Sequence, residues 1–144
     1  MSDSLKNQTL TKDEGIALLK AHDVTPTQQR VDIARILFAR SQHMSAEQVM
    51  LAANRAGADV SKATVYNTLG LFAGKGMVRQ VIVDSAKVFY DSNTSPHFHF
   101  YNVDTGKLTD VDERQVNITR LPTLPDGTVT DGVDVIIRVR QDKS

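Results

Sequence analysis

The sequence predicts an α+β fold, in which a helical first half that ends in a β-hairpin precedes a smaller, strand-rich second half. Three observations lead to this prediction. Capping residues and helically spaced apolar residues recur as far as Gly76, and β-branched residues then dominate two short runs. A polar, Pro-containing segment follows at 92–96, and the runs beyond it alternate in the manner of strands.

Four segments of the first half carry helix-start signals. Residues 11–14 (TKDE) form a capping box, and residues 45–48 (SAEQ) start another helix with a hydroxyl-bearing residue. In residues 25–28 (TPTQ), Pro is suited to the first helical position, so we expect Thr25 to cap the second helix. Ser61 is expected to cap the fourth.

A β-hairpin is predicted next, because residues 77–83 and 87–91 are rich in β-branched and aromatic side chains. Short helices followed by a hairpin are the order of the winged helix-turn-helix. Its core would be the helices at 46–56 and 62–73, joined by a turn at 57–60. Many winged helices bind partners other than DNA, so a module that binds only protein stays open as an alternative.

The second half is predicted to form strands at 97–101, 107–111 and 133–140. We place the domain boundary before residue 93, which gives domains 1–92 and 93–144. A three-stranded unit of about 50 residues buries little apolar surface by itself. We therefore expect this unit to pair with a second copy of itself.

The composition is that of a globular protein, since 40% of the 144 residues are hydrophobic and 24% are charged. Neither a membrane span nor a secretory signal is evident, so we expect a cytoplasmic protein. The absence of Cys excludes disulfides, thiolate zinc sites and a Cys nucleophile. The net charge is zero, but residues 24–83 carry seven basic and three acidic side chains, and residues 93–144 carry six and eight. This imbalance is compatible with a first half that contacts phosphates.

Two histidines of the second half form a candidate metal site. His97 and His99 lie two positions apart in a predicted strand, so both imidazoles point to the same face. A hairpin that turns near residue 105 would bring Asp110 opposite His99 and Asp112 opposite His97, and Asp91 could fold back towards them. Imidazoles with carboxylates suit Fe(II), Mn(II) or Zn(II). The alternative is a pair of solvated histidines on an exposed strand.

The predicted helix at 62–73 offers candidate DNA contacts in Lys62, Thr64, Tyr66 and Asn67, since Asn reads adenine and Lys meets phosphate or guanine. The alternative is an ordinary solvated helix face. His43 by itself is a loop residue, and His22 would complement a helix dipole. No catalytic triad, P-loop or dinucleotide-binding motif is present.

Several runs together resemble one known family. They are TPTQQRVDIARIL (25–37), HMSAEQV (43–49), SKATVYNTLGLFAGKGMV (61–78), VFYDSN (88–93) and HFHF (97–100). In this combination they are similar to the ferric uptake regulator (Fur) superfamily, over about residues 15–140. The Cys-free tail, with LPTLPDG and VDVIIRVR, is most similar to the iron response regulator (Irr) branch, and Cys-free peroxide-sensing (PerR-like) regulators come next.

The resemblance implies a winged-helix DNA-binding domain followed by a small C-terminal α/β dimerisation domain, acting as a homodimer on pseudo-palindromic double-stranded operators. It implies one divalent ion per subunit, Fe2+, Mn2+ or Zn2+, where the domains join. The ligands carried over by motif are His43, Asp91, His97, His99 and Asp110. The recognition helix would be 62–73, and the DNA contacts implied are Arg30, Ser61, Lys62, Thr64, Tyr66 and Asn67.

The chain departs from the family pattern at Phe98, which interrupts the longer His run of many relatives. We therefore expect a single regulatory site, and haem is an alternative cofactor for which Phe98 removes a ligand. Without Cys the structural zinc of other members is absent, so packing and sheet pairing would hold the dimer.

The leading hypothesis is a metal-responsive repressor of iron, haem or oxidative-stress genes, and not an enzyme. The first alternative is a PerR-like peroxide sensor, in which iron-catalysed oxidation modifies His43 or His97. An alternative of another class is a small His/Asp metalloenzyme, for which Glu113 is the nearby candidate base.

Overall fold

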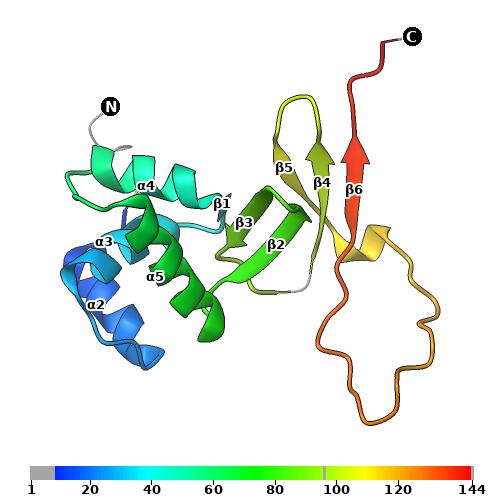
Figure 1. Ribbon diagram of the computed structural model, residues 1–144, viewed down its shortest axis with the longest axis horizontal. Coiled ribbons are helices and arrows are strands. Elements are labelled where there is room, and N and C mark those ends of the chain that lie inside the picture. The colour runs from blue at the N-terminus through cyan, green and yellow to red at the C-terminus, as the bar shows by residue number, and fades with distance from the viewer. Residues whose placement is uncertain (1–8, 96, 144) are drawn as a thin grey trace. The chain divides into compact units, whose positions relative to one another are not determined.

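The computed structural model describes residues 9–95 and 97–143 and divides into two compact units, Met1–Thr94 and Ser95–Ser144. Residues 1–8, Pro96 and Ser144 lie outside this description, and Pro96 is part of the predicted boundary segment. The predicted α+β class is confirmed, because helices and two small sheets make up the two units (Figure 1). Within the described ranges, none of the helices has the length and apolar character needed to cross a membrane.

Four helices form most of the described part of the first unit, residues 9–94: α2 (Lys12–Ala21), α3 (Gln28–Leu37), α4 (Ala46–Arg55) and α5 (Lys62–Gly74). Capping residues determine where they begin. The Thr11 side chain accepts the Glu14 N–H, and Ser45 accepts the Gln48 N–H, while the Glu14 and Gln48 side chains bond back to the cap N–H groups. Both are complete capping boxes, which satisfy N–H groups that the helix itself leaves unpaired.

The cap of α3 differs from the prediction. The helix begins at Gln28 rather than at Pro26, and its cap is Thr27, whose hydroxyl accepts the Arg30 N–H at 3.3 Å. The prediction of Thr25 was wrong because two Thr residues compete for this position, and Pro26 precedes the cap instead of occupying the first turn. The Thr25 carbonyl instead accepts a hydrogen bond from the Arg30 guanidinium at 2.9 Å.

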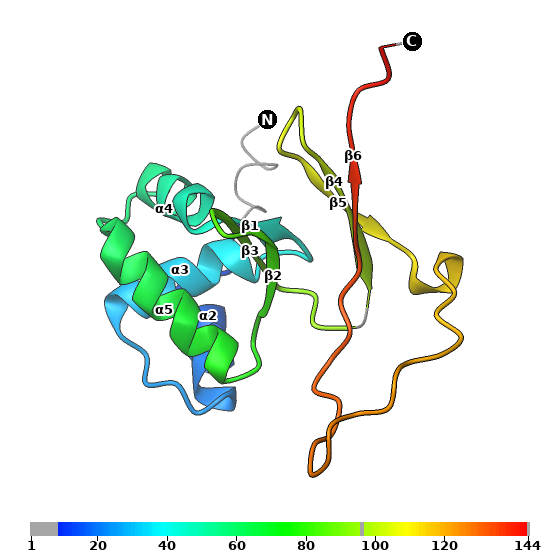
Figure 2. The same cartoon turned by 45° about the vertical axis from the view of Figure 1, so that its right-hand side comes forward.

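The sheet of the first unit contains the predicted hairpin and one strand that was not predicted. Its strands are β1 (His43–Met44), β2 (Arg79–Asp84) and β3 (Lys87–Asp91), in the antiparallel order β1-β3-β2. Figure 2 shows this sheet beside the helices, with β3 between its two neighbours. His43 was predicted to lie in a loop, but it is in fact a strand residue paired with the end of the hairpin.

A single apolar core holds α2 to α5 and the base of the hairpin together. Ile33 and Leu37 of α3 and Leu69 and Phe72 of α5 are fully buried in it. The close packing of α2 on α3 depends on Gly15, since a Cβ there would lie 3.2 Å from the Arg35 side chain. Burying side chains of this size contributes about 1.5–3 kcal/mol each, which makes this core the main source of stability in the unit.

The second unit is built on a smaller sheet. Its strands are β4 (Phe98–Asn102), β5 (Leu108–Val111) and β6 (Ile136–Val139), in the order β5-β4-β6, with β6 parallel to β4. The helical element in the described part of this unit is the 3-10 helix η1 (Glu113–Gln115). The chain from η1 to β6 runs through a long irregular excursion (Figure 2). A parallel pair requires such a crossover, and two Pro residues in it disfavour an α-helix.

Candidate metal centre

The hairpin of β4 and β5 brings three of the predicted ligands together. His99 pairs directly with Asp110, as predicted, and His97 precedes β4 by one residue. The Nε2 atoms of His97 and His99 lie 3.4 Å and 3.5 Å from the same carboxylate oxygen, Oδ1 of Asp110. The two imidazole centroids are 4.5 Å apart. Two nitrogen donors and one oxygen donor therefore converge within 4.8 Å of one another.

The surroundings of His97 determine which ring nitrogen is available. Its Nδ1 lies 2.7 Å from the Ser95 carbonyl oxygen, which can only accept a hydrogen bond, so Nδ1 carries the proton. In the neutral imidazole this leaves a lone pair on Nε2, the atom that faces Asp110. A carbonyl partner of this kind fixes the tautomer of a metal-binding histidine. Both imidazoles are buried, whereas the Asp110 side chain is 55% exposed.

The other two predicted ligands are neighbours in the sheet of the first unit. His43 of β1 and Asp91 of β3 are directly paired, and Arg79 of β2 pairs with Asp91 from the other side. Directly opposite residues of an antiparallel sheet have their side chains on the same face. Asp91 is buried, and one of its carboxylate oxygens accepts the Asn93 N–H at 2.9 Å. The His43 ring meets the Phe89 ring edge-on at 6.2 Å between centroids.

Asp112 does not join His97, contrary to the expectation that it could lie opposite. It follows β5 and caps η1, where its carboxylate accepts the Arg114 N–H and three bonds from the Arg114 guanidinium, the shortest 2.7 Å. These bonds from Arg114 lower the pKa of the Asp112 carboxyl. The chain turns into the 3-10 helix directly after Val111, so the register of the hairpin ends before it reaches Asp112.

Arg30 lies in α3, and the other five predicted DNA-contacting residues lie at the start of α5. Ser61 caps the helix by accepting the Thr64 N–H at 3.1 Å, and its hydroxyl also donates to the Thr64 side chain at 3.0 Å. Tyr66 and Asn67 are exposed on the first turns, and the Lys62 ammonium lies 6.0 Å from the centroid of the Tyr66 ring. Ser61 and Thr64 thus fix the start of the helix. Lys62, Tyr66 and Asn67 are exposed to solvent at this N-terminal end.

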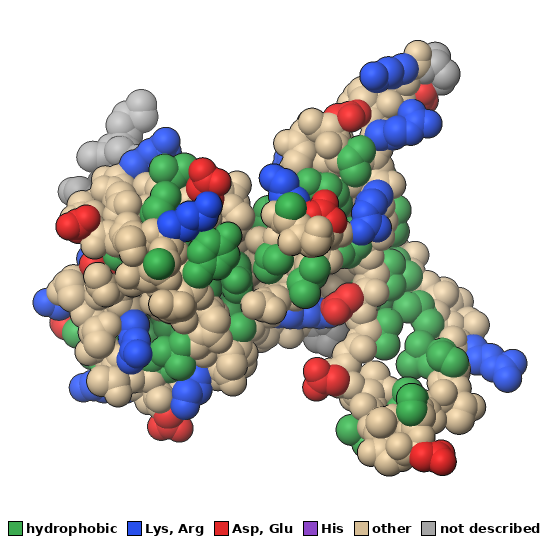
Figure 3. All heavy atoms as spheres, in the orientation of Figure 1, with side chains coloured by type: hydrophobic (Ala, Val, Ile, Leu, Met, Phe, Trp, Pro, Cys, Tyr) green, Lys and Arg blue, Asp and Glu red, His purple; other side chains and the backbone are tan. Residues whose placement is uncertain are grey.

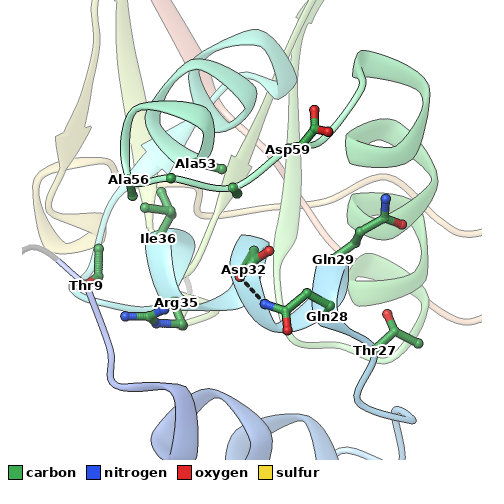
Figure 4. Close-up of a pocket in the computed structure, with 12 residues that line it drawn as sticks. Thr9, Thr27, Gln28, Gln29, Asp32, Arg35, Ile36, Ala53, Ala56 and Asp59 are labelled. Atoms are coloured by element: carbon green, nitrogen blue, oxygen red, sulfur yellow. Dashed lines mark hydrogen bonds between the residues drawn. The ribbon is translucent and has the colours of Figure 1, made fainter.

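A polar cavity of about 670 Å3 lies elsewhere in the first unit, between α3 and the segment at 53–59 (Figure 4). Asp32 and Gln28 on its wall bond to each other at 2.9 Å. None of the predicted ligands lines this cavity.

Comparison with known proteins identifies the family. Residues 21–124 match the sequence profile of the Ferric uptake regulator family. The chain belongs to this family. The peroxide-responsive repressor PerR of Staphylococcus aureus (strain USA300) is 31% identical over 105 residues, which cover 73% of this chain and 71% of that protein. Members of the family are dimeric, DNA-binding transcription regulators and not enzymes, as expected.

Solved structures of the family share the fold. The ferric uptake regulator from Pseudomonas aeruginosa with manganese superposes with a TM-score of 0.66 at 30% identity, and covers 88% of this chain and 97% of that one. The Vibrio cholerae ferric uptake regulator superposes with a TM-score of 0.67 at 21% identity, and the match covers 88% of this chain and 98% of that one. The assignment of this Fur-family chain to the Irr branch stays a prediction.

Sequence reasoning missed three residues that hold the candidate ligands of this Fur-family chain. Arg79 was counted only as part of the basic segment, yet it flanks Asp91 in the sheet. Gln42 and Ser92, which adjoin His43 and Asp91, bond to each other between β1 and β3. Ser92 could have been noticed from its position next to a candidate ligand, whereas a lone Gln before a short strand carries no sequence signal.

Proposed function

We propose that this chain is a repressor that binds a pseudo-palindromic DNA operator as a homodimer and responds to one divalent ion per subunit. One observation carries the proposal. The five candidate ligands form two groups, and the His43–Asp91 group belongs to the unit that holds the recognition helix. The His97–His99–Asp110 group belongs to the other unit. Domains 1–92 and 93–144 would have the DNA-binding and the dimerising role.

The donor atoms fit a divalent ion. Neutral imidazole nitrogens and carboxylate oxygens are the ligands that Fe(II), Mn(II) and Zn(II) share, and the family includes a structure with manganese. When bound, such an ion supplies two positive charges that offset the two carboxylates. His43 and Asp91 would then be held together with His97, His99 and Asp110. Only the residues between Asp91 and His97 link the two groups along the chain, so a shared ion would restrict how the two units move.

The first unit has the features of a DNA reader. Tyr66 and Asn67 are exposed on the early turns of α5, where a recognition helix contacts base edges, and Lys62 lies beside them. Lys and Arg side chains are scattered over the visible face of this unit (Figure 3). Arg30 is proposed to contact phosphate. These contacts predict an operator affinity that falls steeply with salt. Such a target places the protein in the cytoplasm with the chromosome.

The second unit has an exposed apolar sheet face that supports a homodimer. Phe100 of β4 and Ile137 and Val139 of β6 are each more than a third exposed, although strand register places Phe100 beside Ile137. A shallow hollow of about 360 Å3 between Phe100, Lys107 and Val139 continues this face. Self-association would bury the apolar surface that the small sheet leaves in water.

Restricting the two units would change DNA affinity through geometry. The two recognition helices of a dimer must match half-sites about one helical turn apart. A shift of about 1.4–2.7 kcal/mol between matched and unmatched arrangements changes operator affinity about 10- to 100-fold. The metal response therefore needs only a small differential energy from the five ligands.

Replacement of His43 tests the proposal. A duplex selected from a random pool by the Mn2+-loaded wild-type protein serves as the operator, and its affinity is measured with and without Mn2+. We expect the metal-induced gain to disappear in His43→Ala and to persist in His22→Ala. His22 is the matched control because its ring lies at the end of α2, where Nδ1 is 3.0 Å from the Leu18 carbonyl oxygen, and it is not one of the candidate ligands. An operator affinity that ignores Mn2+ and chelator in the wild type would rule the metal response out.

The likeness to a peroxide-responsive repressor supports a second candidate, in which peroxide is the signal. In that case Fe2+ and peroxide would oxidise His43 or His97, and the oxidised chain would leave the operator. Mass spectrometry of peptides after this treatment checks the candidate. Oxygen addition at either residue, with His22 unmodified, supports it, and unmodified peptides speak for metal sensing alone. The regulated genes would be those of oxidative stress in this case, and of iron or haem otherwise.

A further inference from the structure

Gln42 connects the end of α3 to the strand that carries His43. Its side-chain amide donates hydrogen bonds to the carbonyls of Ile36, at 2.9 Å, and Leu37, at 3.1 Å. These carbonyls lie in the last turn of α3, where the helix provides no N–H partner. The carboxamide has two N–H groups, so one side chain satisfies both. His43 is the next residue along the chain, which leaves no flexible spacer between them.

Ser92, the residue after β3, forms hydrogen bonds with the backbone of Gln42, the residue before β1. The Ser92 N–H donates to the Gln42 carbonyl at 2.9 Å, and the Gln42 N–H donates to the Ser92 hydroxyl oxygen at 3.0 Å. The same hydroxyl lies 2.9 Å from the Arg40 carbonyl and can donate to it. This pair follows the His43–Asp91 pair in the antiparallel register. We call the hydrogen-bonded pair of Gln42 and Ser92 the clip. His43 follows Gln42 and Asp91 precedes Ser92, so each of these two candidate ligands is next to one residue of the clip.

The end of α3 that the clip holds contacts the recognition helix. Leu37 is fully buried in the core that α3 shares with α5, and Phe38, the residue after the helix, packs on Phe72 of α5. The centroids of these two rings are 5.7 Å apart with the planes tilted by 52°. A displacement of β1 would thus reach α5 through well-packed side chains, which transmit strain rather than absorb it.

We propose that Gln42 is a positioning residue that couples the His43–Asp91 pair to the recognition helix inside one DNA-binding unit. This inference rests on the proposed function, because the coupling has meaning only if metal changes DNA affinity. Metal binding would then affect DNA affinity in two ways. It would restrict the arrangement of the two units, and it would also shift the recognition helix within the DNA-binding unit. Ligation that shifts β1 would shift the last turn of α3, and Phe38 would carry this shift to Phe72.

The test compares variants that remove the donors with variants that keep the chemistry. Gln42→Met retains the length of the side chain but has no N–H to offer Ile36 and Leu37. Ser92→Ala removes the hydroxyl of the clip, and Ser92→Thr restores one. Gln141→Met is the matched control, since the bond recorded for Gln141 is from its backbone N–H and its side chain is exposed. Thermal unfolding of the full-length proteins shows which variants are folded.

Two measurements are made on each folded variant. The first is the ratio of the operator affinity at saturating Mn2+ to that after chelation. Saturation loads every variant fully, so a lower affinity for Mn2+ does not change this ratio. The second is the hydrogen exchange of the Phe38 amide, which donates to the Ala34 carbonyl at 3.0 Å in the last turn of α3. A residue that merely stabilises the fold would lower the melting temperature without changing either metal response.

We expect the Mn2+-induced gain in affinity to fall at least about fivefold in Gln42→Met, equivalent to about 1 kcal/mol. Ser92→Ala should lose part of the Mn2+-induced gain in affinity, while Ser92→Thr and Gln141→Met should keep the gain of the wild type. Mn2+ should slow exchange at Phe38 in the wild type and not in Gln42→Met. If Gln42→Met unfolds, the comparison of the Mn2+-induced gain in Ser92→Ala with that in Ser92→Thr tests the inference. Equal gains in wild type, Gln42→Met and Ser92→Ala overturn the inference alone. A wild type that ignores Mn2+ overturns the proposed function and the inference with it.

Discussion

Replacing Asp110 by Asn removes one negative charge from the candidate metal site while keeping the shape of the side chain. One oxygen of this carboxylate lies 3.4 Å and 3.5 Å from the Nε2 atoms of His97 and His99, so an ion bound by both rings would be next to it. Asp110→Asn should therefore weaken Mn2+ binding without changing the β4–β5 register.

The expected size of the effect follows from charge and exposure. A dication and a carboxylate about 4 Å apart attract each other by about 2 kcal/mol in bulk water, and by about 8 kcal/mol at an effective dielectric constant of 20. The Asp110 side chain is 55% exposed, which places it near the aqueous limit. A loss of about 2–3 kcal/mol corresponds to a Kd for Mn2+ about 30- to 150-fold higher.

Competition with a fluorescent chelator at pH 7 measures this Kd. Asp112→Asn is the matched control, because Asp112 lies two residues further on and its carboxylate is bound to Arg114 outside the cluster. We expect Asp112→Asn to bind Mn2+ as the wild type does. Equal affinities for the two variants and the wild type would refute the assignment of Asp110 as a ligand.

Three further predictions concern the fold, the helix cap and the dimer. Phe72→Ala empties a fully buried position and should lower the free energy of unfolding by about 3–5 kcal/mol, measured by urea titration. The Thr11 backbone N–H, through its hydrogen bond, lowers the pKa of Glu14, so this carboxylate stabilises the fold at neutral pH and loses its contribution as the pH falls below about 4. Glu14→Gln should flatten this acid dependence in thermal unfolding. Phe100→Glu places a charge on the exposed sheet face and should shift sedimentation from dimer to monomer, whereas an unchanged dimer would locate the interface elsewhere.

Local signals were sufficient to predict most of the elements. Thr11 and Ser45 were recognised as helix caps because capping depends on residues only three positions apart. The pairing of His99 with Asp110 followed from a short turn, which fixes the register of a hairpin. Asp91 was already a candidate because it precedes His97 by only six residues. The family resemblance then added His43, which no local pattern connected with the two histidines.

Long-range pairing set the limit of what the sequence predicted. β1 has two residues, too few for any periodicity, so its pairing with β3 and the resulting His43–Asp91 neighbourhood were not predicted. The parallel pairing of β6 with β4 depends on a long irregular crossover whose path no residue pattern determines. Gln42 was missed for a related reason, since its partners are carbonyl groups of α3, and backbone groups leave no trace in the sequence.

In the proposed metal response, one ion is bound by His43 of the first unit and by His97 and His99 of the second. Pulsed electron paramagnetic resonance of the Mn2+-loaded protein counts the imidazole nitrogens bound to the ion. We expect three imidazoles in the wild type, two in His43→Ala and three in His22→Ala. Two imidazoles in both the wild type and His43→Ala would contradict the proposal, because His43 would then not be a ligand of the ion.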